Sequence, residues 1–244
     1  MTGVSILNYH NVAQAPDGAA LRKLYVAPDE FARQMRWLKR LGLRGVSLSE
    51  GLWHLERARA RRVVVLTFDD GYADNLQYAA PILRELGFAA TCFVVSGCIG
   101  THNAWDAEQL RVRKPLMDTQ QLRVWLAHGF EIGSHTRSHP HLDTLDDARA
   151  DAEIAGAKAD LERLTGTRID HFCYPYGSVN AKLAERAAAA GYRSAVTTRR
   201  GIARATDNRF LLPRVSINGG KGLLRFVLKA STPYADWHRA RRAA

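Results

Sequence analysis

The sequence contains little cysteine, and its three cysteines stand alone. Cys92, Cys98 and Cys173 form no C-x-x-C pair, so neither a disulfide framework nor a thiolate zinc site organises the chain. No apolar run approaches the roughly 18 residues that a membrane-spanning helix needs. The first ten residues carry no Lys or Arg and only a short apolar stretch, unlike a secretory signal. We therefore expect a cytoplasmic protein.

Acidic residues are few relative to basic ones. The chain has 24 Asp and Glu against 35 Lys and Arg, which gives a formal net charge of +11. Such an excess is typical of proteins that meet nucleic acid, anionic membranes or acidic substrates. The basic clusters are short, and no zinc finger, RNP signature or aromatic-interleaved basic stripe accompanies them. We expect no nucleic-acid partner, and a weak peripheral contact with an anionic membrane as the better alternative.

The chain has an ordinary globular composition, with 46% hydrophobic and 24% charged residues in a length of 244. Its apolar pattern alternates between strands and helices. Predicted strands lie at 4–9, 46–48, 63–68, 89–95, 130–135, 171–175, 192–198 and 210–217. Predicted helices lie at about 28–41, 49–55, 78–86, 119–128, 145–164, 181–190 and 222–228, and 97–117 reads as a long loop.

Repeated βα units predict a parallel sheet. The segment 63–68, VVVLTF, has no polar alternation, so it should be a strand covered on both faces. About seven such units in this length indicate an α/β barrel, which carries its chemistry at the C-terminal ends of its strands. No linker or break in composition divides the chain. We expect one domain over 1–230 and a basic C-terminal tail over 231–244.

Two adjacent carboxylates, Asp69 and Asp70, follow the predicted strand 63–68. Side by side behind a buried strand they repel each other and lose solvation, which is tolerable when a cation lies between them or one is protonated. The alternative is helix capping by Asp70. Capping needs only one Asp, so the pair favours a functional site.

Two histidines, His135 and His139, follow the predicted strand 130–135 at i, i+4 spacing. One helical turn would place both imidazoles on the same side, as in many zinc sites. The alternative is a pair of surface histidines in a polar loop. With Asp70 they make a set of one carboxylate and two imidazoles that leaves positions open for water and substrate. Such an open set is catalytic, because the ion activates water and polarises an acyl oxygen.

Other strand ends supply further candidates. His10 ends the first predicted strand, where it is either an ordinary loop residue or a general acid. Asp69, if Asp70 binds the metal, is a natural general base. The segment 174–177, YPYG, is a rigid turn. It either simply ends its strand or aims a backbone N–H at a developing oxyanion.

Three motifs in this order resemble those of a known family. TFDDG at 67–71, SHTRSHPHL at 134–142 and YPYG at 174–177 are similar to the motifs of NodB-homology polysaccharide deacetylases, carbohydrate esterase family four. The resemblance covers roughly 10–217. It implies a single-domain, distorted (β/α)7 barrel that uses a divalent metal, usually zinc. Members of the family remove acetyl groups from N-acetylated sugars, or O-acetyl groups from xylan.

The resemblance also implies a role for each residue that matches a motif. Asp69 corresponds to the general base. Asp70, His135 and His139 correspond to the metal ligands. Tyr176 corresponds to the tyrosine whose backbone N–H contributes to the oxyanion hole.

The chain departs from the family pattern at two places. The usual Arg two residues before the Pro of the third motif is Cys173, and the late Leu-x-x-His motif of the general acid is missing. The subgroup of poly-N-acetylglucosamine deacetylases shows the same changes and has an early Tyr-His motif, which His10 matches. We infer that His10 is the general acid and that Arg214 supplies the missing positive charge near Asp69.

Three further residues are candidates for contact with the sugar. Trp105 would stack on a pyranose face and Asp106 would bond a hydroxyl, although Trp105 could equally anchor a long loop. Tyr174, in the aromatic strand end, is the third candidate.

The expected function is removal of N-acetyl groups from an N-acetylhexosamine unit of a bacterial envelope glycan or its precursor. The expected substrate is an N-acetylated glycan or a lipid-linked sugar, and the expected cofactor is Zn²⁺. The alternatives are an O-acetyl carbohydrate esterase on the same scaffold and an inactive barrel that only binds glycan. An intact Asp-Asp and His-His set argues against the inactive barrel.

Overall fold

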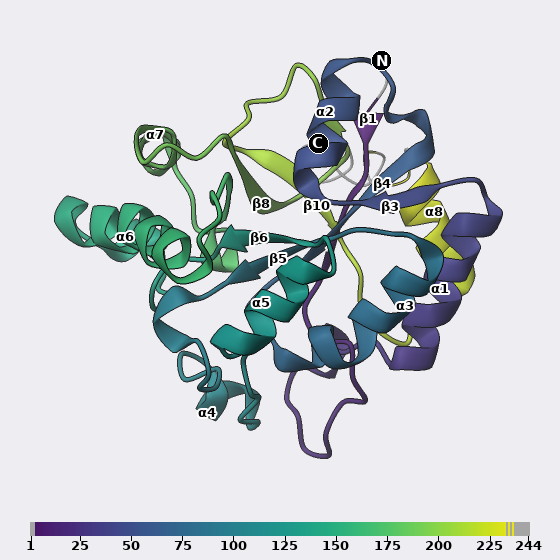
Figure 1. The fold of residues 1–244 in the computed structure, drawn as a ribbon, viewed down its shortest axis with the longest axis horizontal. Helices are drawn as coiled ribbons and strands as arrows, with labels where there is room; N and C mark the ends of the chain where they lie inside the picture. The colour runs from purple at the N-terminus through teal and green to yellow at the C-terminus, as the bar shows by residue number, and fades with distance from the viewer. Residues whose placement is uncertain (1–2, 233, 235, 237–244) are drawn as a thin grey trace, which may run out of the picture.

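The computed structural model describes residues 3–232, 234 and 236. Its main sheet is parallel and closed (Figure 1). Within the described residues seven strands form the ring, in the order β2 (Ile6–Tyr9), β10 (Leu212–Ser216), β8 (Ser194–Arg200), β7 (His171–Cys173), β6 (Glu131–Ser134), β5 (Thr91–Val94) and β4 (Val63–Phe68). The first strand, β2, closes the ring because it pairs with β10 on one edge and with β4 on the other. The expected (β/α)7 barrel is confirmed.

The barrel is distorted beside β4. The strand β3 (Arg44–Val46) pairs with the first three residues of β4, Val63–Val65, whereas β5 pairs only with Thr67 and Phe68. Two short strands, β1 (Gly3–Val4) and β9 (Ala203–Arg204), form a separate antiparallel pair that the sequence pattern did not predict.

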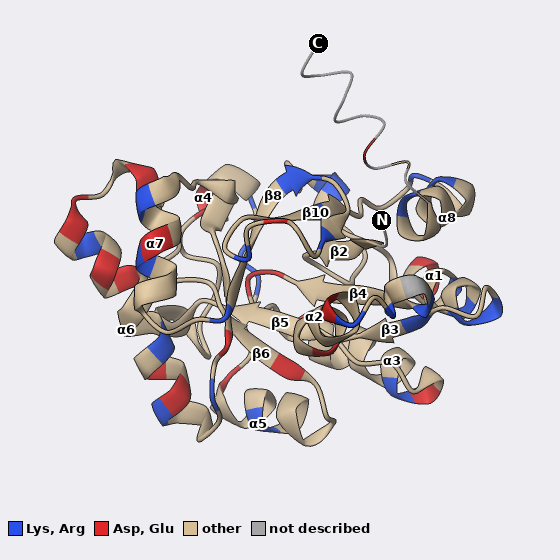
Figure 2. Ribbon diagram, turned by 90° about the horizontal axis from the view of Figure 1, so that it is seen from above, with Lys and Arg blue, Asp and Glu red and all other residues tan. Residues whose placement is uncertain are grey.

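Helices surround the ring of strands (Figures 1 and 2). They are α1 (Pro28–Arg40), α2 (Leu48–Glu56), α3 (Ala80–Leu86), α4 (Ala107–Leu110), α5 (Thr119–Ala127), α6 (Asp147–Thr165), α7 (Ala181–Ala189) and α8 (Leu223–Ser231). No helix among the described residues is long and apolar enough to cross a membrane. Most of the expected tail, 231–244, lies outside the described residues.

The core has two layers, one on each side of the strands. In β4, Val64, Leu66 and Phe68 pack outward against the helices, and Val63 and Val65 pack into the barrel. All six residues of β4 are buried. The uninterrupted apolar run of this strand is therefore explained by burial on both faces.

Several predicted elements differ in their bounds, and the expected loop 97–117 contains the short helix α4. The expected strand 46–48 is the strand Arg44–Val46, because the side chain of Ser47 already accepts the N–H of Glu50 and caps α2. The expected helix 78–86 starts earlier, with a π-helical turn over Asn75–Ala79 that runs into α3. Such turns often occur near functional sites.

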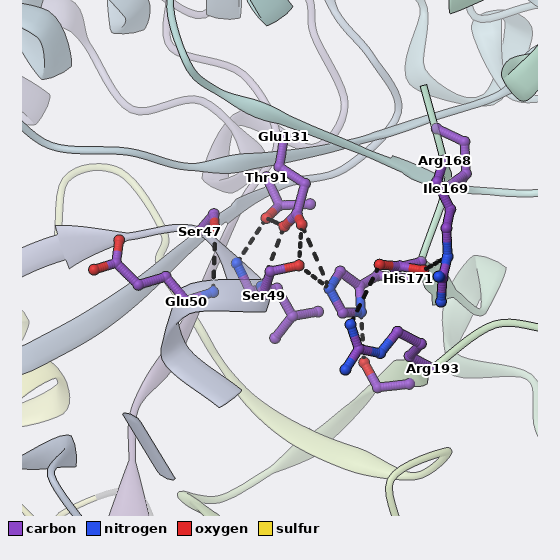
Figure 3. A network of polar contacts seen from close by, with 12 residues as sticks. Ser47, Ser49, Glu50, Thr91, Glu131, Arg168, Ile169, His171 and Arg193 are labelled. Atoms are coloured by element: carbon purple, nitrogen blue, oxygen red, sulfur yellow. Dashed lines mark hydrogen bonds and ion pairs between the residues drawn. The ribbon is translucent and has the colours of Figure 1, made fainter. Parts of the chain in front are cut away.

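A polar cluster closes the barrel at the N-terminal ends of its strands. Figure 3 shows Ser49 of α2, Glu131 of β6 and His171 of β7 pointing toward one another. The Glu131 carboxylate accepts hydrogen bonds from Ser49 and from the Thr91 hydroxyl, and Nδ1 of His171 lies 2.8 Å from the Ser194 hydroxyl. This cluster links α2 to four strands. It lies at the end of the barrel where stability rather than catalysis is expected.

Candidate metal centre

The opposite, C-terminal ends of the strands bring the predicted residues together. His10 follows β2, Asp69 and Asp70 follow β4, and His135 follows β6. The backbone N–H of Asp69 donates to the Tyr9 carbonyl at 3.0 Å, which joins the ends of β2 and β4. Parallel pairing thus carries residues from distant parts of the chain to one mouth.

Asp70, His135 and His139 form a buried ligand set. One ligand atom from each lies within 4.8 Å of the others. Nε2 of His135 and Nε2 of His139 are each 3.4 Å from Oδ1 of Asp70. Tetrahedral ligands at about 2.1 Å from a zinc ion are separated by about 3.4 Å. The three residues therefore fit a divalent metal.

Contacts around His135 prepare it for metal binding. Its Nδ1 lies 2.7 Å from the backbone carbonyl oxygen of Cys173. An Nδ1–H that donates to this carbonyl leaves the Nε2 lone pair directed at the ligand set, as is usual for metal-bound histidines. The backbone carbonyl of Cys173 thus fixes the orientation of the His135 imidazole.

His139 reaches the ligand set through an unusual backbone. The segment from His135 to His139 is not the helical turn that the spacing suggested, since Thr136 and His139 both have left-handed backbones (φ 68° and 62°). Glu153 of α6 holds this turn, because its carboxylate accepts the N–H groups of Arg137 and Ser138 at 2.8 and 2.9 Å. The motif itself contains no signal for Glu153, which sequence reasoning missed.

Backbone strain is concentrated at this mouth. Six non-glycine residues with positive φ occur among the described residues, and four of them are Asp70, Thr136, His139 and Tyr176. Such conformations persist only where the surrounding structure enforces them, and they cluster at functional sites. The strain therefore independently marks the same place as the ligand set.

Asp69 is bound by a buried arginine. Both Nη atoms of Arg214 in β10 lie 2.7 Å from the two carboxylate oxygens of Asp69. Burial raises the pKa of Asp69, but the Arg214 guanidinium, with smaller effects of His135 and His10, brings the pKa below its ordinary value. Asp69 is thus kept ionised.

Arg214 also excludes a metal from a neighbouring group of ligands. Potential ligand atoms of Asp69, His135 and Cys173 lie within 4.8 Å of one another. Nη2 of Arg214 donates to the Cys173 sulfur at 3.1 Å as well as to Asp69. The positively charged guanidinium would repel a metal ion bound by Asp69, His135 and Cys173. The set Asp70, His135 and His139 is therefore the better metal site.

Aromatic side chains surround His139. The Trp105 ring stacks on the His139 imidazole with centroids 4.6 Å apart, and Tyr176 meets the same imidazole edge-on at 4.6 Å. Tyr176 in turn stacks on His141 at 4.0 Å. Trp105 thus lies beside the ligand set and anchors its loop there.

Of the other two expected sugar contacts, Asp106 lies next to Trp105 in the chain, whereas Tyr174 is buried in the core. Burial raises the pKa of Asp106 to about 6, and its carboxylate accepts a hydrogen bond from Asn103 at 2.8 Å. Tyr174 does not reach the mouth. It is fully buried in the outer core, and its hydroxyl donates to the Phe210 carbonyl at 3.1 Å.

The fold and this site define an α/β barrel with a candidate metal centre at its mouth. The family model of polysaccharide deacetylases matches residues 56–195. YxkH of Bacillus subtilis (strain 168) is 30% identical over 217 residues, which are 88% of this chain and 71% of that protein. The chain belongs to the polysaccharide deacetylase family and is a carbohydrate deacetylase, a hydrolase.

The chain also resembles a second relative and two solved structures. A poly-beta-1,6-N-acetyl-D-glucosamine N-deacetylase of Staphylococcus aureus (strain MRSA252) is 23% identical over 231 residues, covering 87% of this chain and 78% of that protein. The structure of the Streptococcus pyogenes deacetylase PplD in complex with acetate superimposes with a TM-score of 0.81 at 27% identity. The superposition covers 95% of this chain and 99% of the PplD chain. IcaB from Ammonifex degensii shares the fold, with a TM-score of 0.78 at 23% identity over 94% of this chain and 97% of that one.

Proposed function

We propose that the chain removes N-acetyl groups from N-acetylhexosamine units of a bacterial envelope glycan or its precursor, in the cytoplasm. The observation that carries the proposal is the ligand set Asp70, His135 and His139 beside the Arg214–Asp69 pair. The name of the Staphylococcus relative supports an amide as the bond that is cleaved.

The three ligands suit a divalent cation, most simply Zn²⁺, which would activate water and polarise the acetyl oxygen when bound. Asp69, kept ionised by Arg214, accepts the proton of the attacking water. The backbone N–H of Tyr176, held at φ 58°, stabilises the developing oxyanion. His10 donates a proton to the nitrogen of the leaving amine.

The sugar contacts are assigned to the loop after β5. The half-buried Trp105 ring stacks on His139, and the part of the ring that His139 leaves uncovered can contact a pyranose ring. Asp106 lies next to it and can accept a hydrogen bond from a hydroxyl group once it is ionised. A lipid-linked sugar and a polymer are both compatible with these contacts.

Acetate release tests the proposal. Purified protein is incubated with N-acetylglucosamine oligomers, with a lipid-linked N-acetylhexosamine and with acetylated xylan, each with and without a chelator. We expect chelator-sensitive release from an N-acetylated substrate. Release from xylan alone would replace the N-deacetylase by an O-acetyl esterase, and no release after zinc addition would favour a glycan-binding barrel.

A further inference from the structure

Helices α1 and α8 pack together on the outside of the barrel (Figure 1) and expose large apolar side chains. Leu224 of α8 exposes 75% of its surface, the largest fraction among the large apolar side chains of the described residues. Leu228, one turn later, exposes 36%. On α1, Trp37 exposes 37%, and Leu41, the residue that caps the end of α1, exposes 46%. Four of the exposed large apolar side chains thus belong to two neighbouring helices.

The two side chains on α1 lie on its α8-facing stripe. The N–H of Gly220, just before α8, donates to the Glu30 carboxylate at 3.1 Å, so the first turn of α1 meets the start of α8. Gln34, one turn after Glu30, lines a small cavity shared with the start of α8. Positions 30, 34, 37 and 41 form one stripe of an α-helix. Trp37 and Leu41 therefore continue this stripe beside α8.

The two leucines of α8 form the outer edge of its apolar face. Leu223 and Val227 pack partly buried against the core. Leu224 and Leu228 follow them by one residue each and are one turn apart, so they share the neighbouring stripe. We call Trp37, Leu41, Leu224 and Leu228 the α1–α8 patch. Leu224 and Leu228 share one stripe of α8, and Trp37 and Leu41 belong to the neighbouring segment 28–41; exposed apolar side chains on one helix face mark an interaction surface.

Basic side chains border the α1–α8 patch. The segment 221–231 contains Lys221, Arg225 and Lys229 and no acidic residue. Burial, with the neighbouring cations Arg225, Arg200 and Lys221, lowers the pKa of Lys229 to about 8. Arg36 and Arg40 lie on the solvent side of α1. The charge around α8 is therefore positive, whereas the first turn of α1 carries Asp29 and Glu30.

We propose that the α1–α8 patch docks on the surface of an anionic lipid bilayer. Leucine and tryptophan side chains on a helix that also carries Lys and Arg are the composition of a helix that lies in the membrane interface. The apolar side chains enter the boundary of the headgroups while the cations meet anionic lipids. In sequence, Arg239, Arg241 and Arg242 follow α8 and add to the charge of this end of the chain.

Docking of this face also selects a substrate class, an inference that rests on the proposed function. Helix α8 begins seven residues after the C-terminal end of β10 at Ser216. Its first turn, with Leu224, therefore lies toward the same end of the barrel as the ligand set, whereas Leu41 ends α1 toward the opposite end, where β3 begins. An N-acetylhexosamine attached to a membrane lipid would be held within reach of this mouth, whereas a freely diffusing oligomer would gain nothing from docking.

Vesicle sedimentation tests the proposal. The full-length protein is mixed with vesicles of phosphatidylcholine alone and with vesicles that contain about one third phosphatidylglycerol. We expect binding to the anionic vesicles that weakens with salt. The double variant Leu224→Ser, Leu228→Ser should bind about tenfold or more weakly. Leu21→Ser is the matched control. Leu21 is 41% exposed and lies outside α1 and α8, so this variant should bind like wild type.

Charge is tested separately. Arg225→Glu should weaken binding to anionic vesicles, and Arg149→Glu, the same change on exposed α6, should not. Wild-type protein that stays in the supernatant with both kinds of vesicle overturns the proposal. So does a double variant that binds as well as wild type. Loss of a dimer in the double variant, with no vesicle binding by wild type, would assign the patch to contact between copies of the chain.

The same variants separate this proposal from the proposed function. Acetate release from a soluble N-acetylated oligomer should be unchanged in the double variant, while release from a lipid-linked substrate in anionic vesicles should fall. Vesicle binding without any deacetylation would contradict the proposed function but would still support membrane docking by the α1–α8 patch. Equal loss on both substrates would contradict the docking role.

Discussion

Arg214 and Asp69 are joined by two hydrogen bonds of 2.7 Å although 145 residues separate them in the chain. The guanidinium also donates to the Cys173 sulfur, at the position where the family pattern has an arginine. An arginine of β10 thus contacts both the Asp69 carboxylate and the β7 position at which the resemblance implies an arginine. We infer that Arg214 supplies the positive charge that an arginine of β7 would supply.

Replacing Arg214 by lysine should separate the effect of its positive charge from the effect of its two hydrogen bonds to Asp69. Arg214→Lys keeps the positive charge but loses the planar pair of donors. We expect kcat for acetate release to fall about 10²-fold, because the Asp69 carboxylate loses its fixed orientation. The metal content should stay at the wild-type level, which mass spectrometry of the purified variant measures.

A swap of the two positions is the sharper version of this prediction. Cys173→Arg combined with Arg214→Cys returns the arginine to β7, and it should recover part of the activity that Arg214→Cys alone loses. A swap no more active than Arg214→Cys would show that the guanidinium must come from β10.

The ligand set makes a prediction about metal content. His139→Ala should lose metal and activity together, because three protein ligands leave no redundancy. His141→Ala is the matched control, since His141 stacks on Tyr176 but is not among the three ligands. Full metal occupancy in purified His139→Ala would refute the assignment.

The role of His10 predicts a difference between substrates. His10→Ala should fold, retain its metal and lose amide hydrolysis by about 10²- to 10⁴-fold. An aryl acetate needs little protonation of its leaving group, so its hydrolysis should suffer much less. Initial rates on both substrates measure this. Equal losses would indicate that His10 positions other groups instead.

The polar cluster at the other end of the barrel predicts a pH dependence of stability. Burial raises the pKa of Glu131, but hydrogen bonds from His171, Ser49 and Thr91 outweigh it and lower the pKa from 4.5 to about 2. A lowered pKa in the folded state stabilises the fold above the unfolded-state pKa. That stability is lost as the pH falls through the folded-state pKa. The difference between 4.5 and about 2 corresponds to at most about 3 kcal/mol.

Glu131→Gln tests this prediction. The free energy of unfolding, measured in urea at several pH values, should be lower in the variant at neutral pH, and the difference from wild type should shrink below about pH 4.5. Acetate release by the folded variant at neutral pH should be unchanged, since Glu131 begins its strand and the ligand set lies at strand ends. A difference that is independent of pH would contradict the charge argument.

Much of the fold could be predicted because its signals are local. The apolar run of β4 and the alternation of strands with helices depend on neighbouring residues, and they were enough to predict a parallel barrel. The boundary at Ser47 was misplaced, because either of two serines, Ser47 or Ser49, could cap the helix, and only the folded structure shows that Ser47 accepts the N–H of Glu50.

The sequence by itself determined the barrel and the ligand types, since Asp70, His135 and His139 lie in motifs that follow buried strands. Only the tertiary structure decided how these residues are used. The register that closes the ring sets the distance from Arg214 to Asp69, and packing of α6 holds the strained turn before His139. Contact between α1 and α8 likewise joins two helices that are nearly 200 residues apart in the chain. Local sequence cannot encode such relationships, because each depends on how distant segments pack in three dimensions.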